Sequence, residues 1–234
     1  GSANVALGFE ALKSSTTAID NIAIGNLTLH KSTTGNGNVA IGTSTLENNT
    51  TGYQNVGIGA DVLVNNIGGY ENTAIGAAAL TNNTSGSLNV AIGHAAMQMN
   101  TTGGSNTALG YQALILNTTG GGNTALGILA NYRNTTGSSN TSVGNNAGNV
   151  ITSGSNNTII GESANVDSGS ATNRIVIGAD ASGTADNTLT VGGHSNNQIT
   201  NWLPGSNNYT DLGSPDRMFK DIYFNGKLKG GASV

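Results

Sequence analysis

The chain has 234 residues, of which 9% are charged and 4% are aromatic, and it carries a net charge of −4. A weakly acidic chain of this kind offers no basic surface for nucleic acid, and its apolar runs stay below the roughly 18 residues that a membrane-spanning helix needs. Because it contains no cysteine, disulfides and thiolate metal sites are excluded as well. We therefore expect no nucleic-acid partner and no membrane insertion.

From Asn4 onward the chain repeats one phrase with a constant 17-residue period. A shorter twelfth copy, "TLTVG", ends at Gly192, a 14-residue step from the matching glycine of the eleventh copy, Gly178. Spacing this regular predicts a stack of similar structural units, because a disordered chain would not keep its aliphatic residues in phase. We number the repeat from 1 to 17, and position 1 is Asn4, Asn21, Asn38, Asn55, Asn72, Asn89, Asn106, Asn123, Asn140, Asn157 and Arg174.

The first part of each repeat has the pattern of a short strand that ends at a corner. Position 2 is β-branched in all eleven copies, position 3 is mostly alanine and position 4 is always aliphatic, as in Val39-Ala40-Ile41. This alternation predicts a strand whose residues at positions 2 and 4 contribute to the core. Position 5 is glycine in all eleven copies, which indicates a backbone corner with positive φ or a close backbone approach.

The second part of each repeat predicts another short segment and a second corner. Position 8 is small and position 9 is apolar as far as Leu114, and a phrase such as "NTTG" follows. Two segments and two glycine corners describe one rung of a parallel β-solenoid, or β-roll, in which rungs stack about 4.8 Å apart. We expect side-chain amide ladders from Asn at positions 1 and 12, and hydroxyl ladders from Thr at positions 13 and 14.

The predicted fold is therefore all-β, with a solenoid over residues 1–192 and a small β-rich cap over residues 193–234. The apolar core of one column is thin, which favours a homotrimer of packed or intertwined chains over a monomeric solenoid. After Leu114, position 9 becomes Asn131, Gly148, Asn165 and Ser182. We expect the second segment to lose its core contact near residues 128–150 and the column to narrow toward a 14-residue rung.

Three stretches of the sequence resemble known families. "NVAIG", at Asn38 and Asn89, resembles the head repeat of YadA-like trimeric autotransporter adhesins, which implies a trimeric β-roll. "NTALGYQALILNTTGGGN" is similar to 17-residue repeats in tail-fibre proteins of phages and viruses. "YTDLGSPDRMFKDIYFNGKL", residues 209–228, resembles the segment that precedes the self-cleaving intramolecular chaperone of tail fibres. That resemblance implies a trimer-locking module and makes Ser233 a candidate cleavage site.

Few residues suggest chemistry. His30, His94 and His194 fall at different repeat positions, so we expect no metal site among them. Glu162, Asp167, Asp180 and Asp186 lie in neighbouring rungs, where paired carboxylates would suit glycoside hydrolysis and solvated edge charges are the alternative. We favour the edge charges, and predict no catalytic, cofactor-binding or metal-binding residues.

These observations predict a non-enzymatic structural segment of a phage or viral tail fibre that takes part in host attachment. The expected partners are two further copies of the chain and a glycan or protein receptor on the host-cell surface, and the expected location is the virion. One alternative is the head of a bacterial trimeric adhesin at the cell surface. Another is an ice-binding solenoid, in which stacked Thr pairs form a flat array.

Overall fold

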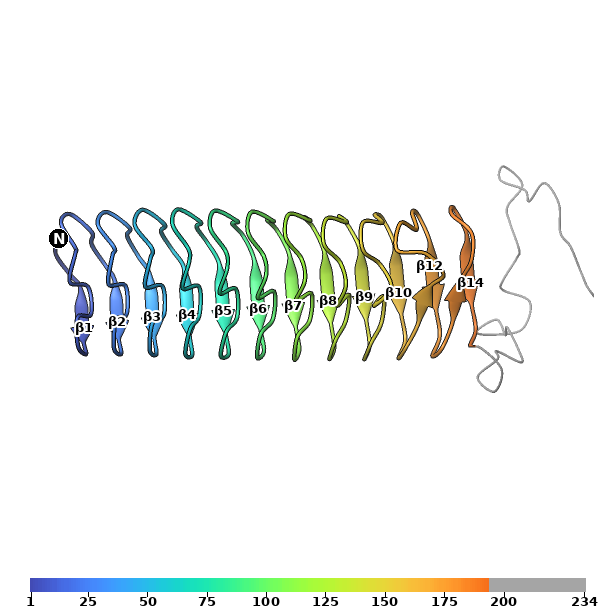
Figure 1. The fold of residues 1–234 in the computed structure, drawn as a ribbon, viewed down its shortest axis with the longest axis horizontal. Helices are drawn as coiled ribbons and strands as arrows, with labels where there is room; N and C mark the ends of the chain where they lie inside the picture. The colour runs from blue at the N-terminus through green and yellow to red at the C-terminus, as the bar shows by residue number, and fades with distance from the viewer. Residues whose placement is uncertain (194–234) are drawn as a thin grey trace, which may run out of the picture. The chain divides into compact units, whose positions relative to one another are not determined.

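The computed structural model describes residues 1–193, which form a parallel β-solenoid with no helix in that range (Figure 1). Each repeat contributes one strand at positions 2–4 to a single sheet of twelve strands. The strands are β1 (Val5–Leu7), β2 (Ile22–Ile24), β3 (Val39–Ile41), β4 (Val56–Ile58), β5 (Thr73–Ile75), β6 (Val90–Ile92), β7 (Thr107–Leu109), β8 (Thr124–Leu126), β9 (Thr141–Val143), β10 (Thr158–Ile160), β12 (Ile175–Ile177) and β14 (Leu189–Val191). A second sheet pairs β11 (Asn165–Val166) with β13 (Ser182–Gly183).

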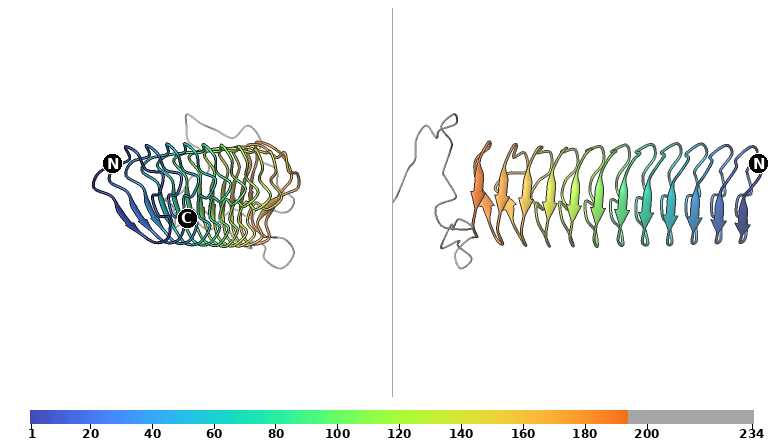
Figure 2. Two further views of the ribbon diagram at one scale, coloured as in Figure 1. Left: turned by 60° about the vertical axis from the view of Figure 1, so that its left-hand side comes forward. Right: turned by 180° about the vertical axis from the view of Figure 1, so that it is seen from behind.

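The strand pairing confirms the predicted 17-residue rung. Val5 pairs with Ile22, and the same 17-residue step joins every neighbouring pair of the main sheet from β1 to β12. The last step of this sheet differs, because Ile175 pairs with Leu189, which is a 14-residue step. Figure 2 shows the rungs following one another along one column when it is turned and when it is seen from behind. The predicted solenoid of residues 1–192 is thus present, whereas the predicted cap lies beyond the described residues from position 194 onward.

The interior of the column is filled from positions 3, 8 and 9. Ala40, Thr45 and Leu46 represent these positions in one rung, and each is fully buried. The prediction that positions 2 and 4 form the core is wrong, because side chains alternate along a strand and position 3 points inward. A Cβ added to Gly57, at position 3, would lie 3.7 Å from Cδ1 of Leu46. The leucine of position 9 therefore faces the strand and leaves room there for a small side chain only.

Side-chain sizes at positions 3 and 8 compensate for one another. Gly57 is the only glycine at position 3, and its rung carries Val62 at position 8, where most other rungs have alanine. An added Cβ at Gly57 would lie 2.7 Å from Cγ2 of Thr45 and 3.4 Å from Cγ1 of Val62. Glycine at this position therefore relieves crowding between these two rungs.

Replacing Gly57 by Ala should destabilise the fold by about 1–3 kcal/mol, because the added methyl group overpacks the interior. Thr45→Ser removes Cγ2, the nearest obstacle, and keeps a hydroxyl that can donate to the carbonyl oxygen of Gly59, as Thr45 does at 2.6 Å. The double variant Thr45→Ser/Gly57→Ala should recover most of the loss in chemical denaturation. If the two changes are simply additive, the contact between these positions is not the cause.

Backbone conformation explains the corners and adds left-handed residues at positions 7, 9 and 17, which the repeat pattern did not predict. Position 5 glycines have φ between +117° and +141°, which confirms the predicted corner. Position 9 is also left-handed, with φ between +49° and +55° from Leu12 to Leu114. A left-handed leucine is strained, so the interior contacts of its side chain must outweigh that strain. Asn131 and Gly148, which follow at this position, are residue types that tolerate positive φ.

The predicted asparagine ladders are present in the interior. At position 1, the Oδ1 atom of each Asn accepts from the backbone N–H and from Nδ2 of the next Asn, as between Asn89 and Asn106 at 3.0 and 3.2 Å. A second ladder runs along position 12 from Asn49 to Asn134, with amide contacts of 2.7–2.8 Å. Both ladders lie in the buried interior, where Asn89, Asn106, Asn49 and Asn134 are fully buried.

The prediction that threonine hydroxyls bond to one another in ladders is wrong. At position 13 the hydroxyl donates to the backbone carbonyl of the next rung, as from Thr101 to Thr118 at 3.0 Å. The same bond joins Thr84 to Thr101 and Thr118 to Thr135, so these hydroxyls bond to the backbone of the next rung. The residues at position 14, such as Thr102 and Thr119, are exposed.

The interior changes composition near residues 128–150, although the second segment keeps its core contact. One apolar cluster ends at Ala130, and another begins at Ala147 and includes Ile151, Ile159 and Val166. Ile159 and Val176 occupy position 3 in rungs where position 9 no longer carries a leucine. The large apolar side chain of the core is therefore supplied by position 9 in the early rungs and by position 3 in the late ones. The expected loss of core contact is therefore wrong, and in the main sheet the 14-residue step occurs at the last rung.

Candidate functional site

The outer face of the main sheet is the most prominent surface feature of the column. Because position 3 points inward, positions 2 and 4 form two outward columns of side chains that run from β1 to β14. Many of their aliphatic side chains are 36–66% exposed. These are Val5, Leu7, Ile22, Ile41, Ile58, Leu109, Leu126, Ile160, Ile175, Ile177, Leu189 and Val191. We call positions 2 and 4 of all twelve strands the aliphatic face.

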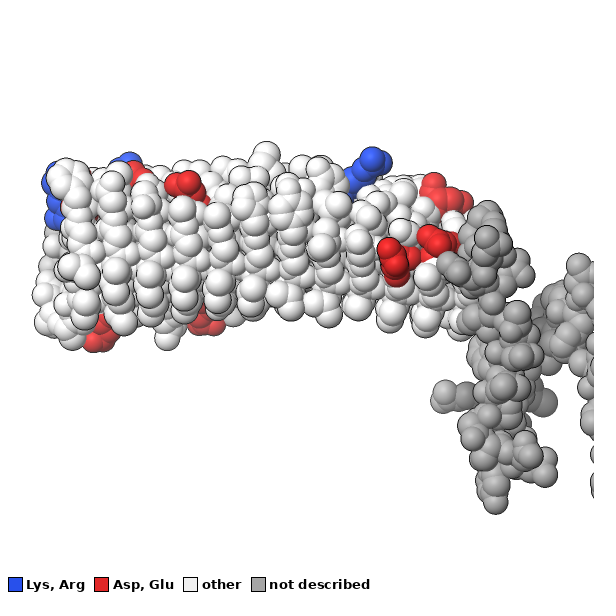
Figure 3. Space-filling model, turned by 90° about the horizontal axis from the view of Figure 1, so that it is seen from below, with Lys and Arg blue, Asp and Glu red and all other residues white. Residues whose placement is uncertain are grey.

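The aliphatic face carries no charge. Positions 2, 3 and 4 contain no charged residue in any of the rungs within residues 1–193. Figure 3 shows one side of the column, which is mostly uncharged and carries several acidic side chains near its C-terminal end. Position 4 stays aliphatic throughout, whereas position 2 changes from mostly Val or Ile to Thr from Thr107 to Thr158. The face is therefore mostly aliphatic near the N-terminus and mixed with hydroxyl groups in its second half.

Apolar and aromatic side chains extend the aliphatic face at its edge. Phe9, Tyr111 and Ile128 occupy position 6, directly after the corner glycine, and are 70%, 47% and 50% exposed. Tyr111 stacks on His94, one rung earlier, with ring centroids 5.5 Å apart. The apolar surface is thus wider than the strands alone.

The second segment presents polar and charged groups among apolar ones such as Met99, which is 44% exposed. At position 11, Lys31 donates to Asn48, and a chain of amide contacts continues through Asn65 to Asn82 at 3.2–3.3 Å. Lys13, Glu47 and Arg133 also lie in this segment, at positions 10 and 11. The two long sides of a rung therefore differ, because the second segment carries charges and the aliphatic face carries none.

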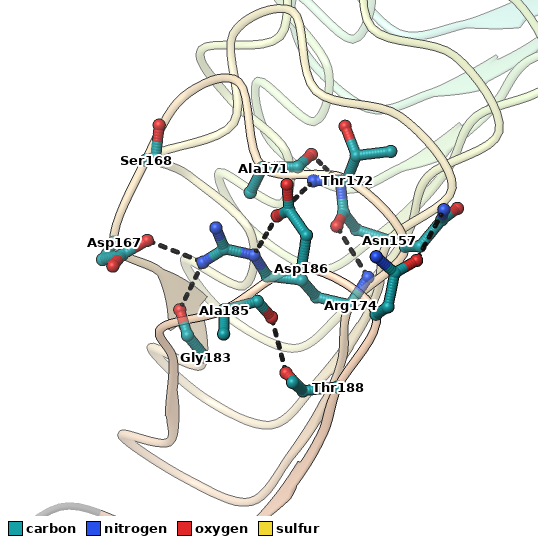
Figure 4. Close-up of polar contacts among 12 residues, drawn as sticks. Asn157, Asp167, Ser168, Ala171, Thr172, Arg174, Gly183, Ala185, Asp186 and Thr188 are labelled. Carbon is teal, nitrogen blue, oxygen red and sulfur yellow. Dashed lines mark hydrogen bonds and ion pairs between the residues drawn. The ribbon is translucent and has the colours of Figure 1, made fainter.

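Two of the four predicted carboxylates meet at Arg174. The Nη1 atom of Arg174 donates to Oδ1 of Asp167 at 2.6 Å and to the carbonyl oxygen of Gly183 at 2.7 Å (Figure 4). Its Nε atom donates to Oδ1 of Asp186 at 2.7 Å. The backbone N–H of Arg174 also donates to Asn157, so this residue ends the asparagine ladder of position 1.

Two carboxylates, Asp167 and Asp186, share the single positive charge of Arg174. Burial alone would lower the pKa of Arg174, but the two carboxylates outweigh it and raise that pKa above its usual value. The N–H of Thr172, followed by the guanidinium of Arg174, holds the pKa of Asp186 below its ordinary value of 3.8. Asp186 is therefore ionised at neutral pH, and its arrangement suits a structural ion pair that joins the last rungs.

Replacing Asp186 by Asn should lower the melting temperature at neutral pH and lose that effect in acid. The pKa of Asp186 is lower in the folded chain, so its ionisation stabilises the fold above the unfolded pKa, and this stabilisation disappears as pH falls through the folded value. The difference between parent and variant should be constant down to about pH 5 and narrow below pH 3.8. Thermal melts across this range measure it, and a difference that widens in acid would contradict the ion pair.

The other two predicted carboxylates lie elsewhere on the rungs. Glu162 is at position 6 and Asp180 at position 7, and the N–H of Asp180 donates to the carbonyl of Glu162 at 2.9 Å. Asp180 borders an open hollow together with Ser163, Asn165 and Ser182. The structure thus pairs Asp167 with Asp186 through Arg174 and does not bring all four carboxylates to one place.

The histidines are also separated. Nδ1 of His30 lies 3.4 Å from Oε2 of Glu10, His94 stacks on Tyr111, and His194 and Ser233 lie outside the described residues. Within residues 1–193, no three His, Asp or Glu side chains gather closely enough to hold a metal ion. The same range contains no helix of the length and apolar character needed to cross a membrane.

Comparison of the chain with protein-family models, with curated protein sequences and with solved structures gave no significant match in any of the three.

The aliphatic face is the feature that sequence reasoning placed in the core. A signal for its true position is present at position 2, where Thr replaces Val or Ile in several rungs although position 3 remains mostly small. A core position would not accept a hydroxyl in so many rungs without a partner for each.

Proposed function

We propose that this chain is a non-enzymatic segment of a phage or viral tail fibre, in which three copies pack together through the aliphatic face. The observation that carries the proposal is the charge-free face of twelve strands, whose aliphatic side chains are exposed in a single chain. With strands about 4.8 Å apart and three residues of about 3.3 Å each, the face measures roughly 50 by 10 Å. An area of roughly 500 Å² lies at the upper end of what monomers expose.

The narrowness of the face favours three chains over two. Each strand contributes only two outward-facing residues, one at position 2 and one at position 4, so the face is two columns of side chains wide. Around a three-fold axis parallel to the column, the first column can pack against one neighbour and the second against the other, which closes the ring. The resemblance of "NVAIG" and "NTALG" to repeats of trimeric adhesin heads and of tail fibres supports the same number.

The function of such a column would be mechanical. Eleven steps of about 4.8 Å give a rigid spacer of roughly 50 Å, bonded along its length by strand pairing and by asparagine ladders. The spacer would hold a surface that binds a host-cell glycan or protein away from the particle. The ion pairing of Asp167 and Asp186 with Arg174 supports a structural role for these carboxylates.

Replacing Ile58 by Lys should abolish the oligomer, because it places a charge in the middle of a buried apolar contact. Thr102→Lys is the matched control, since Thr102 is exposed at position 14 and away from the aliphatic face. Size-exclusion chromatography with light scattering should give a smaller mass for the Ile58 variant only. An unchanged mass for both variants would place the interface elsewhere.

The location of the protein is tested separately. Antibodies raised against the folded column should label the fibres of virus particles in electron microscopy. Labelling of a bacterial cell surface would favour the alternative, the head of a trimeric adhesin. Failure of this experiment leaves the oligomer test intact, so the two parts of the proposal can fail independently.

A second candidate function is ice binding, and one observation favours it. Thr107, Thr124, Thr141 and Thr158 form a regular row of hydroxyl groups beside the aliphatic side chains of position 4 on one sheet. The Thr pairs of positions 13 and 14 fit this function less well, because the hydroxyl of position 13 already donates to the next rung. A monomeric chain with thermal hysteresis would establish this candidate in place of the trimer.

A further inference from the structure

The junction between the two apolar clusters contains buried polar groups without partners. Asn131, Asn134 and Ser142 are fully buried between Ala130, the end of the first cluster, and Ala147, the start of the second. Within the described part of the chain, Oδ1 and Nδ2 of Asn131, Oδ1 of Asn134 and Oγ of Ser142 have no hydrogen-bond partner. Native interiors rarely leave such groups unpaired.

The geometry of the repeat places two of these groups beside one another. Position 3 of one rung faces position 9 of the preceding rung, as Gly57 faces Leu46 at 3.7 Å from an added Cβ. Ser142 and Asn131 occupy the same two positions of a later pair of rungs, and their separation along the chain is the same (142 − 131 equals 57 − 46). Ser142 and Asn131 are therefore neighbouring interior residues of successive rungs, where earlier rungs bring alanine against leucine.

Two further residues of this junction differ from their equivalents in earlier repeats: Gly148 at position 9 leaves space, and Ile151 at position 12 leaves an acceptor unpaired. Gly148 has no side chain at position 9, and a Cβ added there would lie 2.3 Å from Oγ of Ser142, so the hydroxyl points toward that place. The ladder of position 12 ends at Asn134, because Ile151 follows one rung later and offers no amide. The unpaired groups thus belong to the two successive rungs in which the apolar filling is interrupted.

We propose that this junction is an internal water site that divides the solenoid core into two separately unfolding blocks. A buried water molecule usually makes two to four hydrogen bonds to otherwise unpaired polar groups, which matches the amide of Asn131 and the hydroxyl of Ser142 in neighbouring interior positions. The main sheet continues through β8, β9 and β10 without a break, so the division concerns the side chains of the interior (Figure 1).

The division follows from the way in which solenoids are stabilised. Their stability is approximately a sum of contacts between neighbouring rungs, so the weakest contact separates the units that unfold together. The block before Ala130 contains six leucines and a methionine at position 9, whereas the block after Ala147 is shorter. The second block should therefore open first.

Hydrogen exchange of the full chain tests the two blocks directly. Amides of residues 150–190 that donate between rungs should exchange together, and at least tenfold faster than those of residues 40–125. A single exchange rate for both ranges would overturn the proposal, and this measurement needs no variant.

The double variant Asn131→Leu/Ser142→Ala tests the water site, because it restores the residue types of earlier rungs. Water ¹⁷O relaxation dispersion should show fewer long-lived internal waters in this variant than in the parent, and the exchange rates of the two ranges should converge. Leu114→Asn/Ala125→Ser is the matched control, since it creates the same pair one rung earlier and should add internal water. An equal number of long-lived waters in parent and double variant would overturn the site.

Discussion

Replacing Asn89 by Ala is expected to destabilise the fold by about 3–5 kcal/mol, which is a large fraction of the stability of a typical domain. Nδ2 of Asn89 donates to Oδ1 of Asn72 and to the carbonyl of Gly103, and its own Oδ1 accepts twice from Asn106. Alanine removes all four hydrogen bonds and leaves the buried N–H of Asn106 without its partner. Chemical denaturation of parent and variant measures the loss.

Two further variants separate the ladder from simple changes of volume. Asn26→Ala, at an exposed corner, should change the free energy of unfolding by less than about 0.5 kcal/mol. Asn89→Asp keeps the shape but replaces two donors by acceptors and introduces a buried charge, so it should be at least as damaging as alanine. An aspartate variant as stable as the parent would show that the amide contacts contribute little.

Deleting residues 89–105 should leave a folded chain that is shorter by one rung. Leu88 would then precede Asn106, the strand Thr73–Ile75 would pair with Thr107–Leu109, and Leu80 would stack on Leu114 with every position in phase. The deletion should preserve the oligomeric state and shorten the column by about 5 Å, because the lost contacts are those of one layer only.

Deleting Ala91 alone should be far more damaging, although it removes a single residue. Ala91 points into the interior, so its loss turns Ile92 inward toward the leucines of position 9 and moves His94 to the corner. The corner residue, Gly93, has φ of +134°, and a Cβ there would lie 2.4 Å from the carbonyl oxygen of Gly110. Thermal melts that rank the deletion of the whole rung as the more damaging of the two would rule out stacked rungs of this length.

Much of the fold can be predicted from the repeat. The 17-residue period, the corner and the asparagine ladder all follow from local chemistry. The glycine of position 5 has the same function in each rung, and so has the asparagine of position 1 wherever it occurs. The position 5 glycines adopt positive φ, and the position 1 asparagines form the expected buried ladder.

The orientation of the strand could not be predicted from its alternation alone. Two aliphatic residues around an alanine fit a strand facing either way, and the choice depends on what lies opposite, which is the leucine of position 9 in the preceding rung. The left-handed backbone of Leu63 and its equivalents also escaped prediction, since leucine is a poor indicator of positive φ. The partners of the Thr hydroxyls depended on the turn geometry, which the repeat pattern does not contain.

The candidate site follows from that orientation. Once position 3 is inside, the aliphatic residues of positions 2 and 4 require another explanation, and a partner surface provides one. The carboxylates were correctly placed in neighbouring rungs, but Arg174, which holds Asp167 and Asp186, was treated only as a replaced asparagine. A buried arginine at the end of an amide ladder is recognisable as a capping group only when its neighbours are known.

Sedimentation equilibrium of the full chain tests the central claim most directly, namely that the aliphatic face joins three copies of this protein. Three chains of 23.3 kDa should give a mass of about 70 kDa, and Ile58→Lys should reduce it to that of one chain. A parent protein that remains at 23.3 kDa, with its twelve-stranded aliphatic face exposed to water, would contradict the account.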